Sequence, residues 1–189
     1  MKHLSRRKEI IQYAAMLFTE KGYSAVTMRD IAKAVGIKAA SLYNHISSKQ
    51  EILAFIIISL AEEFTNGMEI ILSSKNSSIE KLKQIIALHV SITSNNQSGM
   101  ASLNSDWMHL EDKLDYYLQL REKYEDNFRT IIEQGISNKE LKDENLDVIL
   151  FSILSTLRSL YVWIPNKENI QTNQLSNDLS AVLLNGIVK

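Results

Sequence analysis

The sequence lacks cysteine altogether and contains only one proline and six glycines in 189 residues. Without cysteine no disulfide framework can form, which argues against the small secreted folds that depend on one. The chain also lacks an apolar run of 18 residues, and its start lacks the charged, apolar and small-residue segments of a signal peptide. These absences predict a cytoplasmic protein that neither crosses a membrane nor is secreted.

The scarcity of proline and glycine leaves few points where a helix must end, and apolar residues follow helical spacing almost throughout. An all-α fold is therefore expected. Three Ser/Thr-x-x-Asp/Glu pairs mark helix starts, namely Thr27 with Asp30, Ser48 with Glu51 and Ser77 with Glu80. The pattern predicts helices over 6–21, 28–35, 38–45, 49–73, 78–93, 112–137, 145–164 and 175–188, with a break in the polar stretch 94–98. We divide them into a three-helix head, 1–48, and a body of about six helices, 49–189.

Charge is distributed unevenly although the formal net charge is only -1. Residues 1–50 contain nine Lys and Arg against three Asp and Glu, a balance of +6, whereas 51–189 contain twelve against nineteen, a balance of -7. A basic head attracts a polyanion such as DNA, and an acidic body discourages wrapping of the whole protein by one. An ordinary solvated basic face is the alternative at this point.

The segment Thr27–Lys49 meets the physical demands of a helix-turn-helix motif. Two short helices must cross closely, which the small side chain of Ala32 permits, and Gly36 allows the tight turn between them. Leu42 and Ile46 are spaced to face inward. The second helix has the length to lie in a major groove of DNA.

The order Thr-x-Arg-x-Ile-Ala-x3-Gly-Ile-x4-Leu-Tyr-x-His-x3-Lys in this segment resembles the TetR family of transcriptional regulators, over residues 5–60. The resemblance implies a TetR-like fold and a homodimeric repressor, which a small-molecule inducer releases from a palindromic double-stranded operator. Positions that match phosphate contacts in the family are Thr27, Tyr43, His45 and Lys49. Positions that match approaches to base edges are Arg29, Lys38, Ala39, Ser41 and Asn44.

Two features of this motif leave alternatives open. The chain has Ala39 and Ala40 where larger or more polar residues are frequent, so base readout would depend on Arg29, Lys38 and Asn44, with apolar contacts to thymine methyl groups. Taken alone, Tyr43 could instead be a core aromatic and His45 a cap of its own helix.

The last two long helices, 145–164 and 175–188, are candidates for a dimer interface, because a palindromic operator calls for a two-fold dimer. Ser152, Ser155 and Ser159 form a small polar stripe that would allow close helix approach. The resemblance implies that these helices pair across the axis as a four-helix bundle. The alternative is that they complete the core of a monomer.

The middle of the body contains the candidate inducer site. Tyr117, Arg121, Tyr124 and Phe128 follow one another at i, i+4, i+7 and i+11, so that one helix face carries an arginine among three aromatic rings. Such a face could line a mostly apolar cavity with one anion anchor. Trp107 and Arg158 complete the candidate set. The alternative is that the aromatic rings form core and that each arginine pairs with a glutamate.

A second resemblance concerns the residues 104–135 together with the Tyr-x-Trp-x-Pro sequence at 161–165. They resemble the C-terminal domain of the TetR branch that controls fatty-acid, steroid and phenylacetate catabolism. Members of that branch commonly respond to acyl-CoA thioesters. The resulting hypothesis is an amphipathic, anionic acyl inducer.

Other functions have less support from the residues. An enzyme is disfavoured because there is no cysteine and no glycine-rich phosphate loop, and no catalytic residue or cofactor is expected. The four histidines, His3, His45, His89 and His109, form no i, i+4 ligand pair. A metal sensor would need His89, Asp106, His109 and Glu111 to converge in space. A DNA-binding architectural protein without a ligand also remains open.

Overall fold

The computed structural model of the chain describes residues 5–167 and 170–188. Lys2, which contributes to the basic head, and His3 lie outside the described residues. Within them the only strand-type pairing is the isolated bridge between Leu141 and Val188, and all other regular elements are helical. The expected all-α class is confirmed. The chain divides into two compact units: unit 1 contains residues 1–61 and 98–117, and unit 2 contains 62–97 and 118–189.

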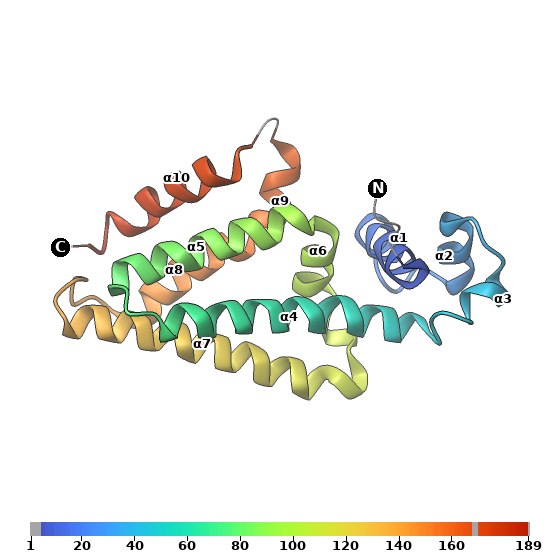
Figure 1. The fold of residues 1–189 in the computed structure, drawn as a ribbon, viewed down its shortest axis with the longest axis horizontal. Helices are drawn as coiled ribbons and strands as arrows, with labels where there is room; N and C mark the ends of the chain where they lie inside the picture. Colours follow the sequence, from blue (N-terminus) through green and yellow to red (C-terminus); the bar gives the residue numbers. More distant parts are fainter. Residues whose placement is uncertain (1–4, 168–169, 189) are drawn as a thin grey trace. The chain divides into compact units, whose positions relative to one another are not determined.

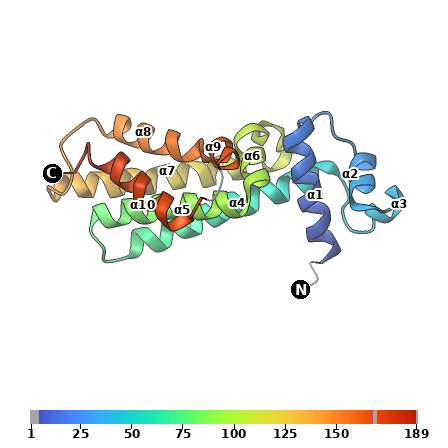
Figure 2. The same cartoon turned by 90° about the horizontal axis from the view of Figure 1, so that it is seen from above.

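Unit 1 contains the helix-turn-helix and a later segment of the chain. Its elements are α1 (Arg6–Lys21), α2 (Met28–Val35), α3 (Ala39–Leu42), the first half of α4 (Lys49–Ser73), nearly all of α6 (Gln97–Ser105), and the 3-10 turns η1 (Trp107–His109) and η2 (Glu111–Lys113). Figure 2 shows α1, α2 and α3 gathered together. Their inner faces share a core in which Ile10, Phe18, Ile31 and Leu42 are almost fully buried.

Local sequence signals account for the start and end of α2. The Thr27 hydroxyl oxygen accepts a hydrogen bond from the Asp30 amide, and the Asp30 carboxylate accepts one from the Thr27 amide, forming the predicted capping box. Gly36 ends the helix in the left-handed conformation with φ of 74°, which residues with a Cβ adopt only with strain. This turn sets the crossing of α2 and α3.

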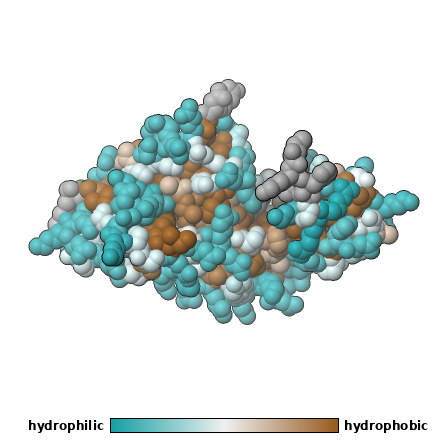
Figure 3. Space-filling model, viewed as in Figure 1, coloured by the Kyte–Doolittle hydropathy of each residue, from teal (hydrophilic) through white to brown (hydrophobic). Residues whose placement is uncertain are grey.

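Unit 2 is built from the second half of α4, α5 (Ser78–Asn95), most of α7 (Leu114–Ser137), α8 (Leu146–Arg158), α9 (Leu160–Trp163), η3 (Ile164–Asn166) and α10 (Thr172–Leu184). Figure 1 shows α10 running along α5, and a groove between them is lined by Ile79, Ala181 and Leu184 among others. Apolar surface is visible in this region (Figure 3). The core includes the fully buried Ile85, Phe128 and Ile131.

The structure differs from the sequence prediction in four places. The α-helical part of α3 ends at Leu42, because the amides of Asn44 and His45 bond three residues back and tighten the expected last turn. Residues 97–105 form α6, where a break was expected through 94–98. The helix expected over 145–164 is interrupted at Ser159, so that α8 and α9 are separate. The last helix, expected over 175–188, runs instead over Thr172–Leu184.

Candidate DNA interface and inducer site

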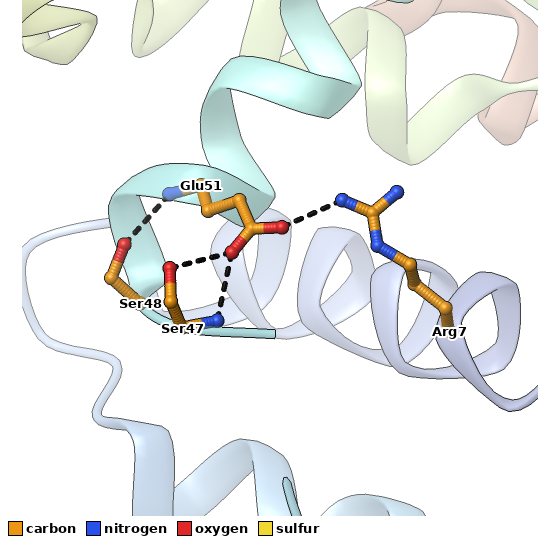
Figure 4. A network of polar contacts seen from close by, with 4 residues as sticks. All are labelled: Arg7, Ser47, Ser48 and Glu51. Atoms are coloured by element: carbon orange, nitrogen blue, oxygen red, sulfur yellow. Dashed lines mark hydrogen bonds and ion pairs between the residues drawn. The ribbon is translucent and has the colours of Figure 1, made fainter. Parts of the chain in front are cut away.

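The first turn of α4 is fastened to α1 and to the loop after α3 through Glu51 (Figure 4). Its Oε1 accepts a hydrogen bond from Arg7 Nη2 at 2.7 Å, and its Oε2 accepts from the Ser47 hydroxyl at 2.6 Å and the Ser47 amide at 2.7 Å. The Ser48 hydroxyl oxygen accepts from the Glu51 amide at 3.0 Å. Hydrogen bonds from Ser47 and then from Arg7 lower the pKa of Glu51 to about 2. The carboxylate therefore stays charged and holds the helix-turn-helix against α4.

All nine residues predicted to contact DNA lie on or beside α2, α3 and the start of α4, and none of them is buried. Thr27, Arg29, Lys38, Tyr43, Asn44 and His45 are exposed, and Ala39, Ser41 and Lys49 are half-buried. The Tyr43 side chain is 54% exposed, so the alternative that it is a core aromatic is wrong. The structure thus presents this set to solvent, and the individual DNA contacts stay predictions.

Two of the predicted phosphate contacts also have partners inside unit 1. The Lys49 ammonium donates to the Tyr23 carbonyl oxygen at 2.7 Å and lies 4.2 Å from the centroid of the Tyr23 ring. The Thr27 hydroxyl donates to Asp30 Oδ2 at 2.5 Å. Contact with a phosphate would have to share or replace these bonds.

Tyr23 also joins α1 to the segment that contains η1. Its hydroxyl donates to Gln50 Oε1 at 2.6 Å, and its ring stacks on His109 with centroids 5.2 Å apart. The Gln50 side-chain amide donates to the His109 carbonyl oxygen. Residues 23, 50 and 109 therefore form one contact group within unit 1, which the sequence did not reveal.

The predicted inducer residues are divided between the two units. Trp107 and Tyr117 lie in unit 1, with ring centroids 5.9 Å apart, and Tyr117 is buried. Arg121, Tyr124 and Phe128 lie on α7 in unit 2, and Arg158 is the last residue of α8. Nothing in these positions tests the inducer assignment, which stays a prediction.

Tyr124 belongs to a buried polar pair in unit 2. Its hydroxyl lies 2.9 Å from His89 Nε2, and the ring of Phe64 packs on His89 with centroids 4.6 Å apart. Burial, and to a lesser extent the nearby Arg158 charge, lowers the pKa of His89 to about 3. Burial likewise raises the pKa of Tyr124 far above its usual value. Both groups are neutral at physiological pH.

Arg121 and Arg158 bind one and the same carboxylate oxygen. Arg121 Nε lies 3.1 Å from Glu125 Oε1, and Arg158 Nη2 lies 2.5 Å from it. Burial opposes ionisation of Glu125, but the hydrogen bonds from Arg158 and Arg121 outweigh it and lower the pKa of the carboxyl group. The expected alternative, that these arginines pair with a glutamate, is thus observed. Glu125 itself was missed, although its i, i+4 spacing from Arg121 was a visible signal.

The metal-sensor hypothesis has no site in the part of the chain that the structure describes. No three His, Asp or Glu side chains there are placed to share a metal ion. His89 lies in unit 2 and is paired with Tyr124, whereas Asp106, His109 and Glu111 lie in unit 1.

Large apolar side chains are exposed on the helices expected to form a dimer interface. On α8, Val148 is 59% exposed and Phe151 is 71% exposed, and Val182 on α10 is 75% exposed. A groove between α8 and α10 runs beside Val148 and is lined by Ser152 and Leu183 among others. By length and apolar character alone, the segment 146–166 could also cross a membrane.

Comparisons with known proteins cover nearly the whole chain. The family model described as bacterial regulatory proteins, tetR family, matches residues 10–56, and the one described as tetracyclin repressor-like, C-terminal domain, matches residues 75–187. The HTH-type transcriptional repressor KstR2 of Mycolicibacterium smegmatis is 23% identical over 188 residues, which cover 98% of this chain and 92% of that protein.

Solved structures agree with the fold. The ketosteroid transcriptional regulator KstR2 of Mycobacterium tuberculosis superposes with a TM-score of 0.90 at 24% identity, over 98% of this chain and 96% of that chain. AibR in complex with isovaleryl coenzyme A and operator DNA superposes with a TM-score of 0.78 at 19% identity, over 94% and 97% of the respective chains. The predicted TetR-like fold is confirmed by these matches.

Proposed function

The chain belongs to the TetR family of bacterial transcriptional regulators, and we propose that it is a cytoplasmic homodimeric repressor that an amphipathic, anionic acyl compound releases from its operator. The family contains regulators and not enzymes, so the prediction that the chain is not an enzyme is confirmed. The observation that carries the proposal is the exposed row of DNA-contact candidates on a helix-turn-helix that Glu51 fastens to α4.

Operator binding is supported by the charge and exposure of this surface. Arg29, Lys38 and Asn44 offer exposed side chains that can reach base edges in a major groove, while Tyr43 and His45 can reach phosphates. Footprinting of the DNA upstream of the chain's own gene tests the proposal. A protected palindrome whose half-sites are about 34–36 Å apart is expected. Uniform protection without a preferred site would contradict it.

The dimer is supported by the exposed apolar face of α8 and α10. Phe151 would be buried between two copies of the chain in such a dimer. Removal of an aromatic side chain from water in this way stabilises an interface. The same burial accounts for the apolar character of 146–166 without a membrane. Phe151→Glu should convert dimers to monomers in light scattering at micromolar concentration. Ile70→Glu, at an α4 residue that is 72% exposed, is the matched control and should remain dimeric.

The inducer class is supported by the two arginines beside an aromatic cluster in unit 2 and by the isovaleryl coenzyme A bound to AibR. An acyl chain would favour the aromatic and aliphatic interior, and its carboxylate or phosphates would favour the guanidinium groups. Footprints repeated with a panel of acyl-CoA thioesters should lose protection with at least one member. Unchanged protection across the panel would remove this part of the proposal.

A ligand-independent architectural role is the second candidate. It is favoured by the dense burial of Tyr124 and Phe128, and by the pairing of both arginines with Glu125 inside the chain. Such a protein would bind many sequences with similar affinity and would not respond to ligands. The same footprints, with and without the panel, separate the two functions.

A further inference from the structure

The Arg121, Glu125 and Arg158 side chains form a charged triad in which two cations share one anionic oxygen. Arg121 precedes Glu125 by one helical turn on α7, whereas Arg158 reaches Glu125 from the end of α8. The formal charges of these three side chains sum to +1. The three side chains are 38%, 32% and 36% exposed, so an anion from solution can approach them.

We propose that Glu125 is an internal competitor, which occupies the position that an anionic group of the inducer takes when it binds. This inference rests on the proposed function, because it concerns the same inducer site. A carboxylate and a phosphate share with Glu125 the chemistry that a guanidinium fork recognises. Both arginines already point at one oxygen, so the incoming anion finds its donors oriented.

Exchange of one anion for another avoids the main cost of binding a charged ligand in a partly buried site. An arginine left alone there would lack a partner, and an added anion without an arginine would be strongly disfavoured. Replacement of Glu125 by the inducer's anion keeps the guanidinium groups paired, and the released carboxylate, on a side chain that is 32% exposed, can turn toward water. The nearby His89 and Tyr124 pair is neutral, so it adds no competing negative charge.

The exchange also allows the inducer to change a contact between two helices of unit 2. The bond between Arg158 and Glu125 links α8 to α7, and these two residues lie 33 positions apart in the chain. When the inducer's anion takes Arg158, that cross-helix bond is lost. Glu125 therefore sets both the affinity and the selectivity for anionic ligands, and it couples ligand binding to the α7 and α8 contact.

Titration calorimetry on the full-length protein with two matched probes tests the inference. Decanoyl-CoA carries the CoA phosphates, and the decanoyl thioester of N-acetylcysteamine has the same acyl chain without them. Glu125→Gln should bind decanoyl-CoA about three- to fivefold more tightly than the wild type, as loss of a partly exposed competing ion pair implies. Its affinity for the neutral thioester should change less than twofold. Glu122→Gln, which removes the same charge at an exposed α7 position, should leave both affinities unchanged.

Every other outcome contradicts either the inference about Glu125 or the proposed inducer class, and the results show which of the two fails. Unchanged or weaker binding of decanoyl-CoA by Glu125→Gln, or equal tightening for both probes, would overturn it while leaving the inducer class intact. If neither protein binds decanoyl-CoA, the proposed inducer class fails, and inorganic pyrophosphate then decides the inference. In an NMR titration, pyrophosphate should shift the arginine Nε–H resonances of the Glu125→Gln protein at a lower concentration than it shifts those of the wild type. Equal responses of the two proteins would overturn the inference.

A second variant guards against loss of structure in Glu125→Gln. Glu125→Asp keeps the charge but withdraws the carboxylate by one methylene, so it should tighten decanoyl-CoA binding in the same direction and by less. Circular dichroism confirms that each variant is folded before titration. A weaker affinity in a folded Glu125→Asp protein would count against the inference.

Discussion

Removal of the Glu51 charge should destabilise the DNA-binding head in a way that depends on pH. The structure gives Glu51 three hydrogen-bond donors, and they lower its pKa from 4.5 to about 2. A shift of this size would correspond to roughly 3 kcal/mol for a fully shielded group. The Glu51 side chain is 35% exposed, so screening by solvent reduces the expected contribution to about 1 kcal/mol.

The sign of the pH dependence follows from the direction of the shift. Because the pKa is lower in the folded protein, the stabilisation is complete above the unfolded value near 4.5 and is lost as the pH falls toward 2. Urea denaturation of the wild type and of Glu51→Gln should therefore show a difference of about 1 kcal/mol at pH 7. That difference should shrink as the pH is lowered below about 4.5.

Glu9→Gln provides the control for this measurement. Glu9 accepts a bond from Arg6 at 2.7 Å, but both residues lie on the same helix surface, three positions apart. An exposed pair of this kind contributes little, so its loss should cost less than about 0.5 kcal/mol. The reasoning is refuted if Glu51→Gln is as stable as the wild type at pH 7, or if the difference between them does not diminish in acid.

Four further substitutions have outcomes that follow from the structure. Tyr43→Phe should weaken binding to all DNA by about 1 kcal/mol, whereas Asn44→Ala should also relax base preference, and mobility shifts on matched and mutated operators measure both. Gly36→Ala should cost about 1 kcal/mol in urea denaturation, because its φ of 74° is strained for alanine although no atom obstructs the new methyl group. Tyr124→Phe should cost about 1 to 3 kcal/mol in the same assay, because the buried His89 Nε2 loses its partner.

Local signals in the sequence were sufficient for many helix boundaries. Thr27 with Asp30 and Ser77 with Glu80 cap the helices that they were expected to start, because a cap depends on residues three positions apart. Residues 97–105 were missed because their small and polar side chains give weak helical periodicity. The interruption at Ser159 was missed because no proline or glycine marks it.

Contacts between segments that are distant in the sequence could not be predicted from the spacing of residues along the chain. Arg7 and Glu51 are 44 positions apart, and Gln50 and His109 are 59 apart, so only the folded chain brings them together. The DNA-contact candidates were easier to predict because they fall within one continuous motif. The i, i+4 spacing marks Glu125 as a partner of Arg121, but its second bond, to Arg158, depends on the meeting of α7 and α8.

Three consecutive residues at the start of α4 have partners in four different parts of unit 1. Lys49 bonds to Tyr23 after α1, Gln50 bonds to both Tyr23 and His109, and Glu51 bonds to Arg7 and Ser47. A ligand changes DNA affinity only if it binds two conformations unequally. Any conformation that displaces η1 must strain or break the Gln50 contacts, and Glu51 lies next to them on the same helical turn. We therefore expect a change in the 98–117 segment to reach α3, the second helix of the helix-turn-helix, through the first turn of α4.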